Sequence, residues 1–122
     1  MRELVLVGAG GLLGAISRFG VSRWLMAAHS VPSHFATLAI NTVGSFLLGY
    51  CVARAGGSGQ FARWQAFLTI GFCGSFTTFS SWILDLGRLA RDSSLRSATH
   101  HMLASLALGV LAVGLGVLLG RH

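Results

Sequence analysis

Charged residues divide this chain into long apolar stretches. Four stretches carry no charged side chain, and they lie at residues 4–17, 24–53, 64–84 and 97–120. A helix that spans a membrane needs about 20 mostly apolar residues, because the hydrocarbon core of a bilayer is about 30 Å thick. The third and fourth stretches meet this length directly, and the second is long enough to hold a turn as well. The pattern therefore predicts helices that cross a membrane.

The first two stretches need a boundary between them, and residues 29–34 are the expected turn because they combine Pro32 with polar side chains. The first stretch is too short by itself. It reaches spanning length if it continues past Arg18 and Arg23, whose long side chains can extend toward the interface. A cleaved signal peptide is the alternative for this segment, since a short apolar core follows Arg2. The sequence thus predicts an all-α membrane protein with one four-helix domain over residues 1–122 and helices at about 4–28, 35–54, 63–86 and 97–120.

Composition supports a membrane setting. Hydrophobic residues make up 53% of the chain and charged residues only 10%, whereas an ordinary soluble domain is about 25% charged. So few charges cannot cover the surface of a soluble protein, and the apolar content also excludes intrinsic disorder. Cys51 and Cys73 lie within apolar stretches without a metal-ligand spacing, so we interpret them as small buried side chains.

The basic residues are nine arginines, and three acidic residues oppose them. The arginines do not cluster, which argues against a nucleic-acid partner. With four spans they divide almost evenly between the two sides of the membrane, with Arg2, Arg54, Arg63 and Arg121 on one side and Arg23, Arg88, Arg91, Arg96 and the slightly deeper Arg18 on the other. The positive-inside rule sets orientation from an uneven distribution. We therefore expect insertion in both orientations and an antiparallel homodimer.

The third predicted helix combines small and polar residues at membrane depth. A stripe of them recurs at intervals of three and four positions and comprises Gly71, Gly74, Thr78, Ser81 and Asp85. Such a dense run favours a local break in the helix, which survives only when it is buried in protein or lines a polar cavity. Carbonyl groups freed at a break could bind a cation. The alternative is an unbroken helix–helix interface whose hydroxyl groups bond back to their own backbone.

The second and fourth predicted helices carry narrow polar stripes at i, i+4 and i+8, which comprise Asn41, Ser45 and Gly49 on one and His101, Ser105 and Gly109 on the other. An asparagine in a bilayer needs partners, and either another helix or an ion could supply them. The spacing that lets membrane helices pack closely occurs at Gly10 and Gly14, and again at Gly116 and Gly120. The sequence carries no hydrolase, nucleotide-binding or zinc-enzyme motif, so we do not expect an enzyme.

Three segments resemble the signature segments of the CrcB/Fluc fluoride channels. They are Gly-Leu-Leu-Gly-Ala-Ile-Ser-Arg-Phe at 11–19, Thr-Leu-Ala-Ile-Asn-Thr-Val-Gly-Ser-Phe at 37–46, and Gly-Phe-Cys-Gly followed by Thr-Thr-Phe-Ser-Ser within 71–81. The match covers essentially the whole chain in order, and the third segment is the most specific. The resemblance implies an antiparallel homodimer that passively conducts fluoride, selects it over chloride, and lowers cytoplasmic fluoride across a bacterial inner membrane.

The resemblance also implies roles for individual residues. The backbone carbonyls of Gly74 and Thr77 would hold a central sodium ion (Na+), and Arg18 would either concentrate anions in a vestibule or tie helices together. The side chains expected along the fluoride path are Asn41, Phe79, Ser80, Ser81, Trp82, His101 and Ser105. Amide and hydroxyl groups donate hydrogen bonds, and aromatic rings have a positive edge, so these residue types suit a small, strongly hydrated anion.

Several positions depart from the family pattern. The departures are Ala36 for a glycine, Ser75 and Phe76 for Gly-Leu, Trp82 for phenylalanine, Asp85 for glutamate and His101 for tyrosine. Trp82 keeps an aromatic edge and adds an N–H donor. We hypothesise that His101 makes the fluoride path sensitive to pH, because imidazole titrates near neutrality.

Two other functions compete with a channel. A small proton-coupled multidrug transporter has a similar length, but that mechanism needs a carboxylate embedded in the first helix, where only Glu3 lies, at its edge. A structural membrane subunit would tolerate Asn41→Ser or Phe79→Ile, whereas a channel would lose fluoride flux. The sequence leaves open whether a paralogous chain forms a heterodimer with this one.

Overall fold

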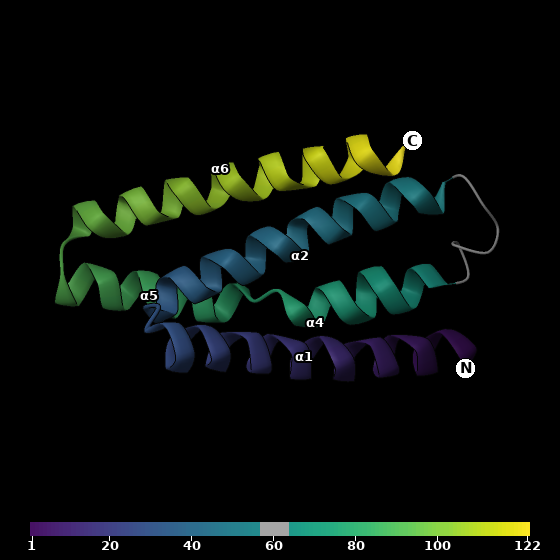
Figure 1. Cartoon of the computed structure of the whole chain (residues 1–122), viewed down its shortest axis with the longest axis horizontal. Coiled ribbons are helices and arrows are strands. Elements are labelled where there is room, and N and C mark those ends of the chain that lie inside the picture. The colour runs from purple at the N-terminus through teal and green to yellow at the C-terminus, as the bar shows by residue number, and fades with distance from the viewer. Residues whose placement is uncertain (57–63) are drawn as a thin grey trace.

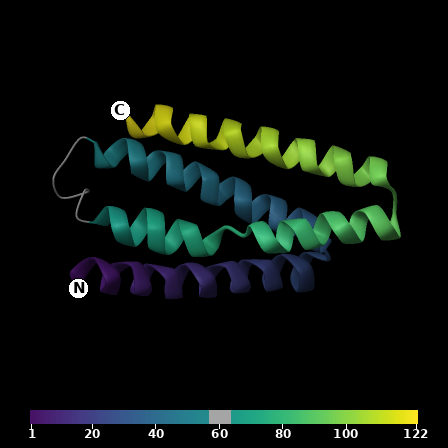
Figure 2. The same ribbon diagram turned by 180° about the vertical axis from the view of Figure 1, so that it is seen from behind.

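Long helices lie side by side in the computed structural model, which describes residues 1–56 and 64–122 (Figure 1). The elements in chain order are α1 (Arg2–His29), α2 (Ser33–Ala55), the π-helix η1 (Ala66–Cys73), α4 (Gly74–Phe76), α5 (Phe79–Asp92) and α6 (Leu95–Gly120). Both termini lie at one end of the bundle, and the turns that join α1 to α2 and α5 to α6 lie at the other (Figure 1, Figure 2). Among the described residues, four helices are long and apolar enough to cross a membrane: Arg2–His29, Ser33–Ala55, Ala66–Asp92 and Leu95–Gly120.

The first, second and fourth helices begin and end within about two residues of their predicted limits. The third was predicted over 63–86, and residue 63 lies outside the described residues. Its predicted end is wrong, because α5 continues to Asp92, where Ser93 and Ser94 both donate their N–H groups to the Leu89 carbonyl. The apolar stretch marked the membrane depth of this helix, whereas the helical hydrogen bonds continue through polar residues beyond it.

The third helix is broken, as predicted. Thr77 (φ −79°, ψ 157°) and Thr78 (φ −147°, ψ 120°) adopt extended backbone conformations between α4 and α5. Because the extended pair interrupts the helix, the small and polar residues on its two halves contact different neighbours. Gly71 packs on α1, and Asp85, on the other half, accepts hydrogen bonds from α2.

Glycines make the closest contacts between helices, as their spacing predicted. Gly10 and Gly14 on α1 lie against the backbone of η1, where an added Cβ would overlap carbonyl oxygen atoms. Gly116 and Gly120 on α6 lie in the same way against the backbone of α2. The bundle thus consists of α2 packed along α6 and of α1 packed along η1 and α4, with α5 reaching across to α6.

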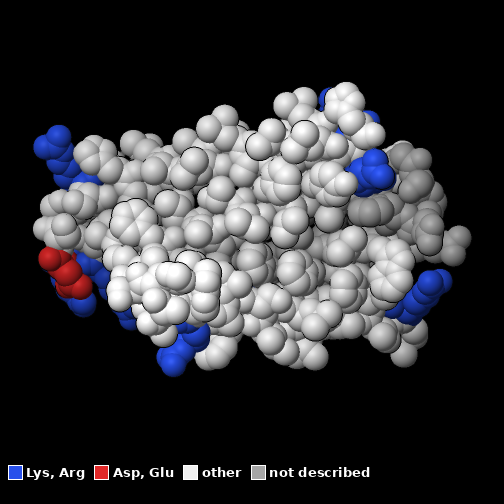
Figure 3. Space-filling view, in the orientation of Figure 1, with Lys and Arg blue, Asp and Glu red and all other residues white. Residues whose placement is uncertain are grey.

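On the face shown in Figure 3, the charged side chains lie toward the two ends of the bundle and the surface between them carries none. Large apolar side chains such as Leu12, Ile16 and Leu111 are exposed along the helices. Cys51 and Cys73 are both buried, as expected. A molecule with an apolar belt and arginines at both ends suits a bilayer.

Candidate functional site

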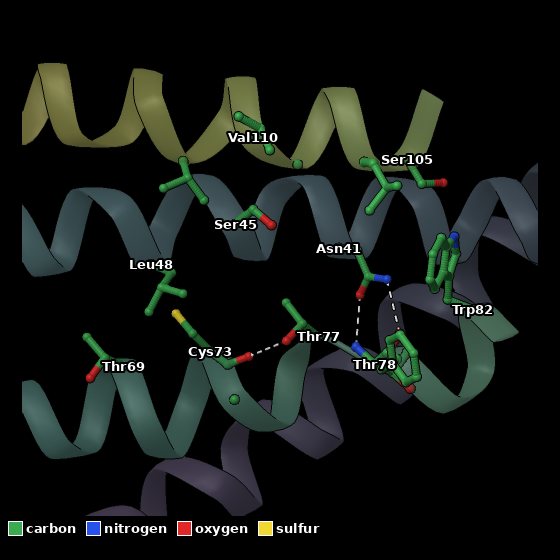
Figure 4. Close-up of a pocket in the computed structure, with 15 residues that line it drawn as sticks. Asn41, Ser45, Leu48, Thr69, Cys73, Thr77, Thr78, Trp82, Ser105 and Val110 are labelled. Atoms are coloured by element: carbon green, nitrogen blue, oxygen red, sulfur yellow. Dashed lines mark hydrogen bonds between the residues drawn. The ribbon is translucent and has the colours of Figure 1, made fainter. Parts of the chain in front are cut away.

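Asn41 on α2 holds the break in the third helix together. Its amide oxygen accepts the backbone N–H of Thr78 at 2.8 Å, and its amide nitrogen donates to the Thr78 carbonyl at 3.1 Å (Figure 4). The Asn41 side chain therefore satisfies both backbone groups of Thr78, which lies outside the regular hydrogen-bond pattern of the helix. Of the two partners predicted for this asparagine, the structure shows the other helix.

Three further hydrogen bonds secure the residues around the break. Thr78 caps α5, since its hydroxyl oxygen accepts the N–H of Ser81 at 3.3 Å. The hydroxyl of Thr77 donates to the Cys73 carbonyl at 2.9 Å. From α1, the Arg18 guanidinium donates through Nε to the Ser75 carbonyl at 3.1 Å. Of the two roles expected for Arg18, this contact shows the one that ties helices together.

The break also frees backbone oxygen atoms. Within residues 1–56 and 64–122, the carbonyl oxygens of Gly74 and Thr77 accept no hydrogen bond. Helix interruptions in membrane proteins use such unwound carbonyls to bind cations. Gly74 is exposed on the surface of the chain, so its backbone is open to a ligand or to a second copy.

A pocket of about 600 Å³ opens beside the break, between α2, the two halves of the third helix, and α6. Its polar lining consists of Asn41, Ser45, Thr69, Thr77, Thr78, Trp82 and Ser105 (Figure 4). Gly74 and Phe79 border it too, and Phe79 is 72% exposed. The remaining wall is mostly aliphatic and includes Cys73. The pocket thus combines a few polar groups with apolar surroundings, which is typical of ligand sites.

Most hydroxyl donors of this pocket are already used within the chain. The hydroxyls of Thr69, Thr77 and Ser105 donate to carbonyls one turn earlier in their own helices, and that of Thr78 donates to Ser81. Asn41 donates one of its two amide hydrogens to the Thr78 carbonyl. An anion in the pocket would therefore find the second hydrogen of Asn41, the hydroxyl of Ser45 and the indole of Trp82 without an acceptor among the described residues.

A second cavity of about 290 Å³ contains a buried carboxylate whose hydroxyl partners the sequence did not predict. Asp85 is 5% exposed, and its two oxygens accept the hydroxyls of Ser33 at 2.8 Å and Thr37 at 2.7 Å. Arg18 and Arg88 line the same cavity. The sequence did carry a signal: a carboxylate within a spanning segment needs donors, and Ser33 and Thr37 lie one helical turn apart on α2.

The residues expected to line one fluoride path lie in different parts of the structure. The large pocket brings together Asn41, Phe79, Trp82 and Ser105, while Ser81 lines the smaller cavity. Ser80 is exposed and lines neither of the two. His101 is buried against the ring of His34, with ring centroids 5.2 Å apart, and its carbonyl accepts the Ser105 hydroxyl.

Comparison with known proteins gives a consistent set of relatives. The family model described as CrcB-like protein, Camphor Resistance (CrcB), matches residues 5–117. A protein of Parabacteroides distasonis named fluoride-specific ion channel FluC is 39% identical over all of this chain and 95% of its own. A Bacillus thuringiensis protein named fluoride-specific ion channel FluC 2 is 39% identical over 98% of both chains. A Chlorobium chlorochromatii protein named fluoride-specific ion channel FluC is 39% identical over 98% of this chain and 92% of its own.

Proposed function

The chain belongs to the CrcB-like family, and from that membership we propose that it is a fluoride-specific ion channel. The observation that carries this proposal is the full-length similarity to relatives named as such channels. Those relatives are ion channels rather than enzymes, and the four apolar helices make the chain a multi-pass membrane protein. Fluoride would leave the cell through it passively, driven by the inside-negative membrane potential.

The channel requires two copies of the chain in this proposal. The pocket beside the break is open on one side, and Gly74, Phe79 and Ser80 are exposed around it. A second copy covering this face would enclose the pocket and separate it from lipid. The nearly even distribution of arginines between the two ends supports an antiparallel arrangement, because neither end is favoured to face the cytoplasm. A bacterial inner membrane is the setting that we infer.

A sodium ion fits the break chemically. The carbonyl oxygens of Gly74 and Thr77 accept no hydrogen bond within the described residues, and backbone oxygens are suitable ligands for an alkali cation. Two such oxygens do not complete a coordination shell, so a second copy would contribute the same pair. The ion would supply positive charge at the dimer interface and hold the two breaks together. Arg18, bonded to the Ser75 carbonyl, supports the same segment from α1.

The transporter alternative has no support from the structure or the relatives. Glu3 is exposed in the first turn of α1, at the end of the bundle where both termini lie. Asp85 is the buried carboxylate, and its two oxygens already accept hydroxyl groups from α2. The relatives described above are named as fluoride channels.

Ion flux from liposomes tests the proposed function. Purified protein is reconstituted into liposomes loaded with potassium fluoride or potassium chloride, and efflux is recorded with ion-selective electrodes after valinomycin is added. We expect rapid fluoride release and no chloride release. Equal release of both anions would refute a fluoride-specific channel.

Two variants test whether the pocket is the ion path. Asn41→Ser and Phe79→Ile alter the pocket while leaving the apolar belt unchanged. A channel should lose most of its fluoride flux with either substitution, and a bacterial host lacking its own exporter should become sensitive to fluoride. If both variants conduct and protect like the parent protein, the pocket is not the ion path.

A further inference from the structure

The end of α5 and the start of α6 form a hairpin that projects from one end of the bundle. Its turn at Ser93 and Ser94 extends past the turn between α1 and α2 in both ribbon views (Figure 1, Figure 2). The charge-free stretches of the chain end at residue 84 and begin again at residue 97. We define the α5–α6 hairpin as residues 86–96, which therefore lie at or beyond the edge of the apolar belt. Its charged residues are Arg88, Arg91, Asp92 and Arg96.

The neighbours of this hairpin place it at the level of the lipid headgroups. Arg88 lines the same cavity as Ser22 of α1, and Ser22 is followed two positions later by Trp24, which is 58% exposed. Exposed tryptophans of membrane proteins gather at the headgroup level. Arg91 follows Arg88 by three residues, a rise of about 4.5 Å along the helix, and the headgroup layer on each side of a bilayer is about 5–8 Å thick. Both arginines therefore lie within reach of lipid phosphates.

Two of the three guanidinium groups of the hairpin are free to bind an anion. All three arginines are exposed. Over residues 1–56 and 64–122 the structure contains one ion pair, in which Arg91 donates through Nε to Asp92 at 2.7 Å. Asp85, the other carboxylate of α5, is buried and accepts hydroxyl groups from α2. Arg88 and Arg96 therefore carry positive charge that no carboxylate of the described residues compensates.

Anionic phospholipid is the partner whose chemistry fits this hairpin. A phosphate group complements the charge of a guanidinium and accepts its hydrogen bonds in a bidentate geometry. The membrane that the four helices cross brings such groups beside the hairpin. Leu95, next to Arg96 at the turn, is 74% exposed. An exposed apolar side chain beside a basic one suits a lipid surface, where the first contacts apolar groups and the second contacts phosphates.

We propose that Arg88 and Arg96 bind the phosphate groups of anionic phospholipids, so that phosphatidylglycerol gathers around this end of the chain in preference to phosphatidylcholine. Both lipids carry a phosphate, but only phosphatidylglycerol has a net negative charge. One arginine near an anionic surface strengthens association about fivefold, so loss of both should weaken it by up to about 25-fold. Arg91 contributes less, because Asp92 neutralises it. This inference needs the membrane-spanning helices but not ion conduction.

Lipid titrations followed by native mass spectrometry measure this preference without an ion gradient. The full-length chain is delipidated in detergent and titrated with phosphatidylglycerol or phosphatidylcholine, and the bound fraction of each lipid is recorded. The test variant is Arg88→Gln/Arg96→Gln. The matched control is Arg54→Gln/Arg121→Gln, which removes the same charge from exposed positions at the opposite end of the bundle.

We expect the parent chain to bind phosphatidylglycerol more tightly than phosphatidylcholine. The test variant should lose this preference, whereas the control should keep most of it and Arg91→Gln should resemble the parent. Equal affinity of the parent for both lipids would overturn the proposal. So would equal losses in the two double variants, since overall charge alone would then explain binding. Displacement of the lipid by an equal concentration of glycerol phosphate would indicate a site for free phosphate and would also refute a lipid site.

Fluoride efflux from liposomes separates this inference from the proposed function. Fluoride-specific efflux without a preference for phosphatidylglycerol would leave the channel intact and remove the lipid site. A preference that depends on Arg88 and Arg96, in a chain that passes no fluoride, would establish the lipid site and refute the channel.

Discussion

Replacing Asn41 by alanine should destabilise the break in the third helix. Asn41 satisfies both the N–H and the C=O of Thr78 at 2.8 and 3.1 Å, and this pair of bonds is partly buried. Each buried backbone group left unpaired costs about 1–3 kcal/mol, so we expect a loss of about 2–6 kcal/mol. A typical protein is stable by only about 5–15 kcal/mol. The variant should therefore lose much of its stability, and fluoride flux should fall with it.

Stability and flux are measured together to separate a positioning role from a general structural one. Thermal unfolding in detergent, followed by tryptophan fluorescence, gives the stability, and liposome efflux gives the flux and the ratio of fluoride to chloride passed. Because Gly74, Thr77 and Thr78 border the pocket, a displaced break should also reduce selectivity in whatever flux remains. A merely weakened helix contact would lower the unfolding temperature without changing that ratio.

Ser45→Ala is the matched stability control. Ser45 lies one helical turn from Asn41 on α2 and lines the same pocket, but it makes no hydrogen bond to the break. Its removal should leave the unfolding temperature nearly unchanged. Should Asn41→Ala unfold at the same temperature as Ser45→Ala and retain the parent selectivity, the two hydrogen bonds to Thr78 do not hold the break.

Three further predictions concern the glycine contacts of α1, the buried carboxylate of Asp85 and the buried ring of His101. Gly14→Ala should lower the unfolding temperature, because the added Cβ would overlap the Phe72 carbonyl, whereas Gly8→Ala on the same helix meets nothing within 4 Å and should not. Asp85→Ala should destabilise more than Asp85→Asn in the same assay, because asparagine keeps one oxygen to accept a hydroxyl from α2; equal losses would contradict this. Fluoride flux should rise from neutral to mildly acidic pH if protonated His101 attracts the anion, and His101→Gln should abolish that rise; a flat parent profile, after correction for HF permeation, would refute it.

The neighbours of His101 decide how this pH response is tested. His34 and Phe35 face its ring, with centroids 5.2 and 6.1 Å away, and Asp85 is the buried carboxylate nearby on α5. His34 brings a second imidazole into contact with that of His101, so its effect must be separated. His34→Gln is therefore measured beside His101→Gln, and the proposed role of His101 requires that only the latter removes the response.

Much of the fold was predictable because membrane helices obey simple length and polarity rules. The spacing of charged residues gave three of the helices to within about two residues, and the glycine spacing identified the close contacts of α1 and α6. The run of Gly, Ser and Thr around Thr77 predicted a break. The end of the third helix was missed, since amphipathic α5 continues past the apolar stretch as far as Asp92.

The site was less predictable, because hydrogen-bond partners come from different helices. The sequence placed Asn41 at membrane depth, but it could not show that both ends of its amide bind Thr78, 37 residues away. Nor could the sequence show that Asp85 on α5 accepts hydrogen bonds from Ser33 and Thr37 on α2. Such pairings depend on the rotation and depth of each helix relative to its neighbours.

The sequence by itself determined that this protein spans a membrane four times and that glycines bring its helices close together, and it favoured a break in the third helix without deciding it. These features follow from local composition and from the spacing of residues along each helix, because in lipid each segment must satisfy its own backbone hydrogen bonds. The tertiary structure alone decided how the break is satisfied and which donors beside it stay free among the described residues. Those outcomes depend on which side chains the packed helices bring within hydrogen-bond distance.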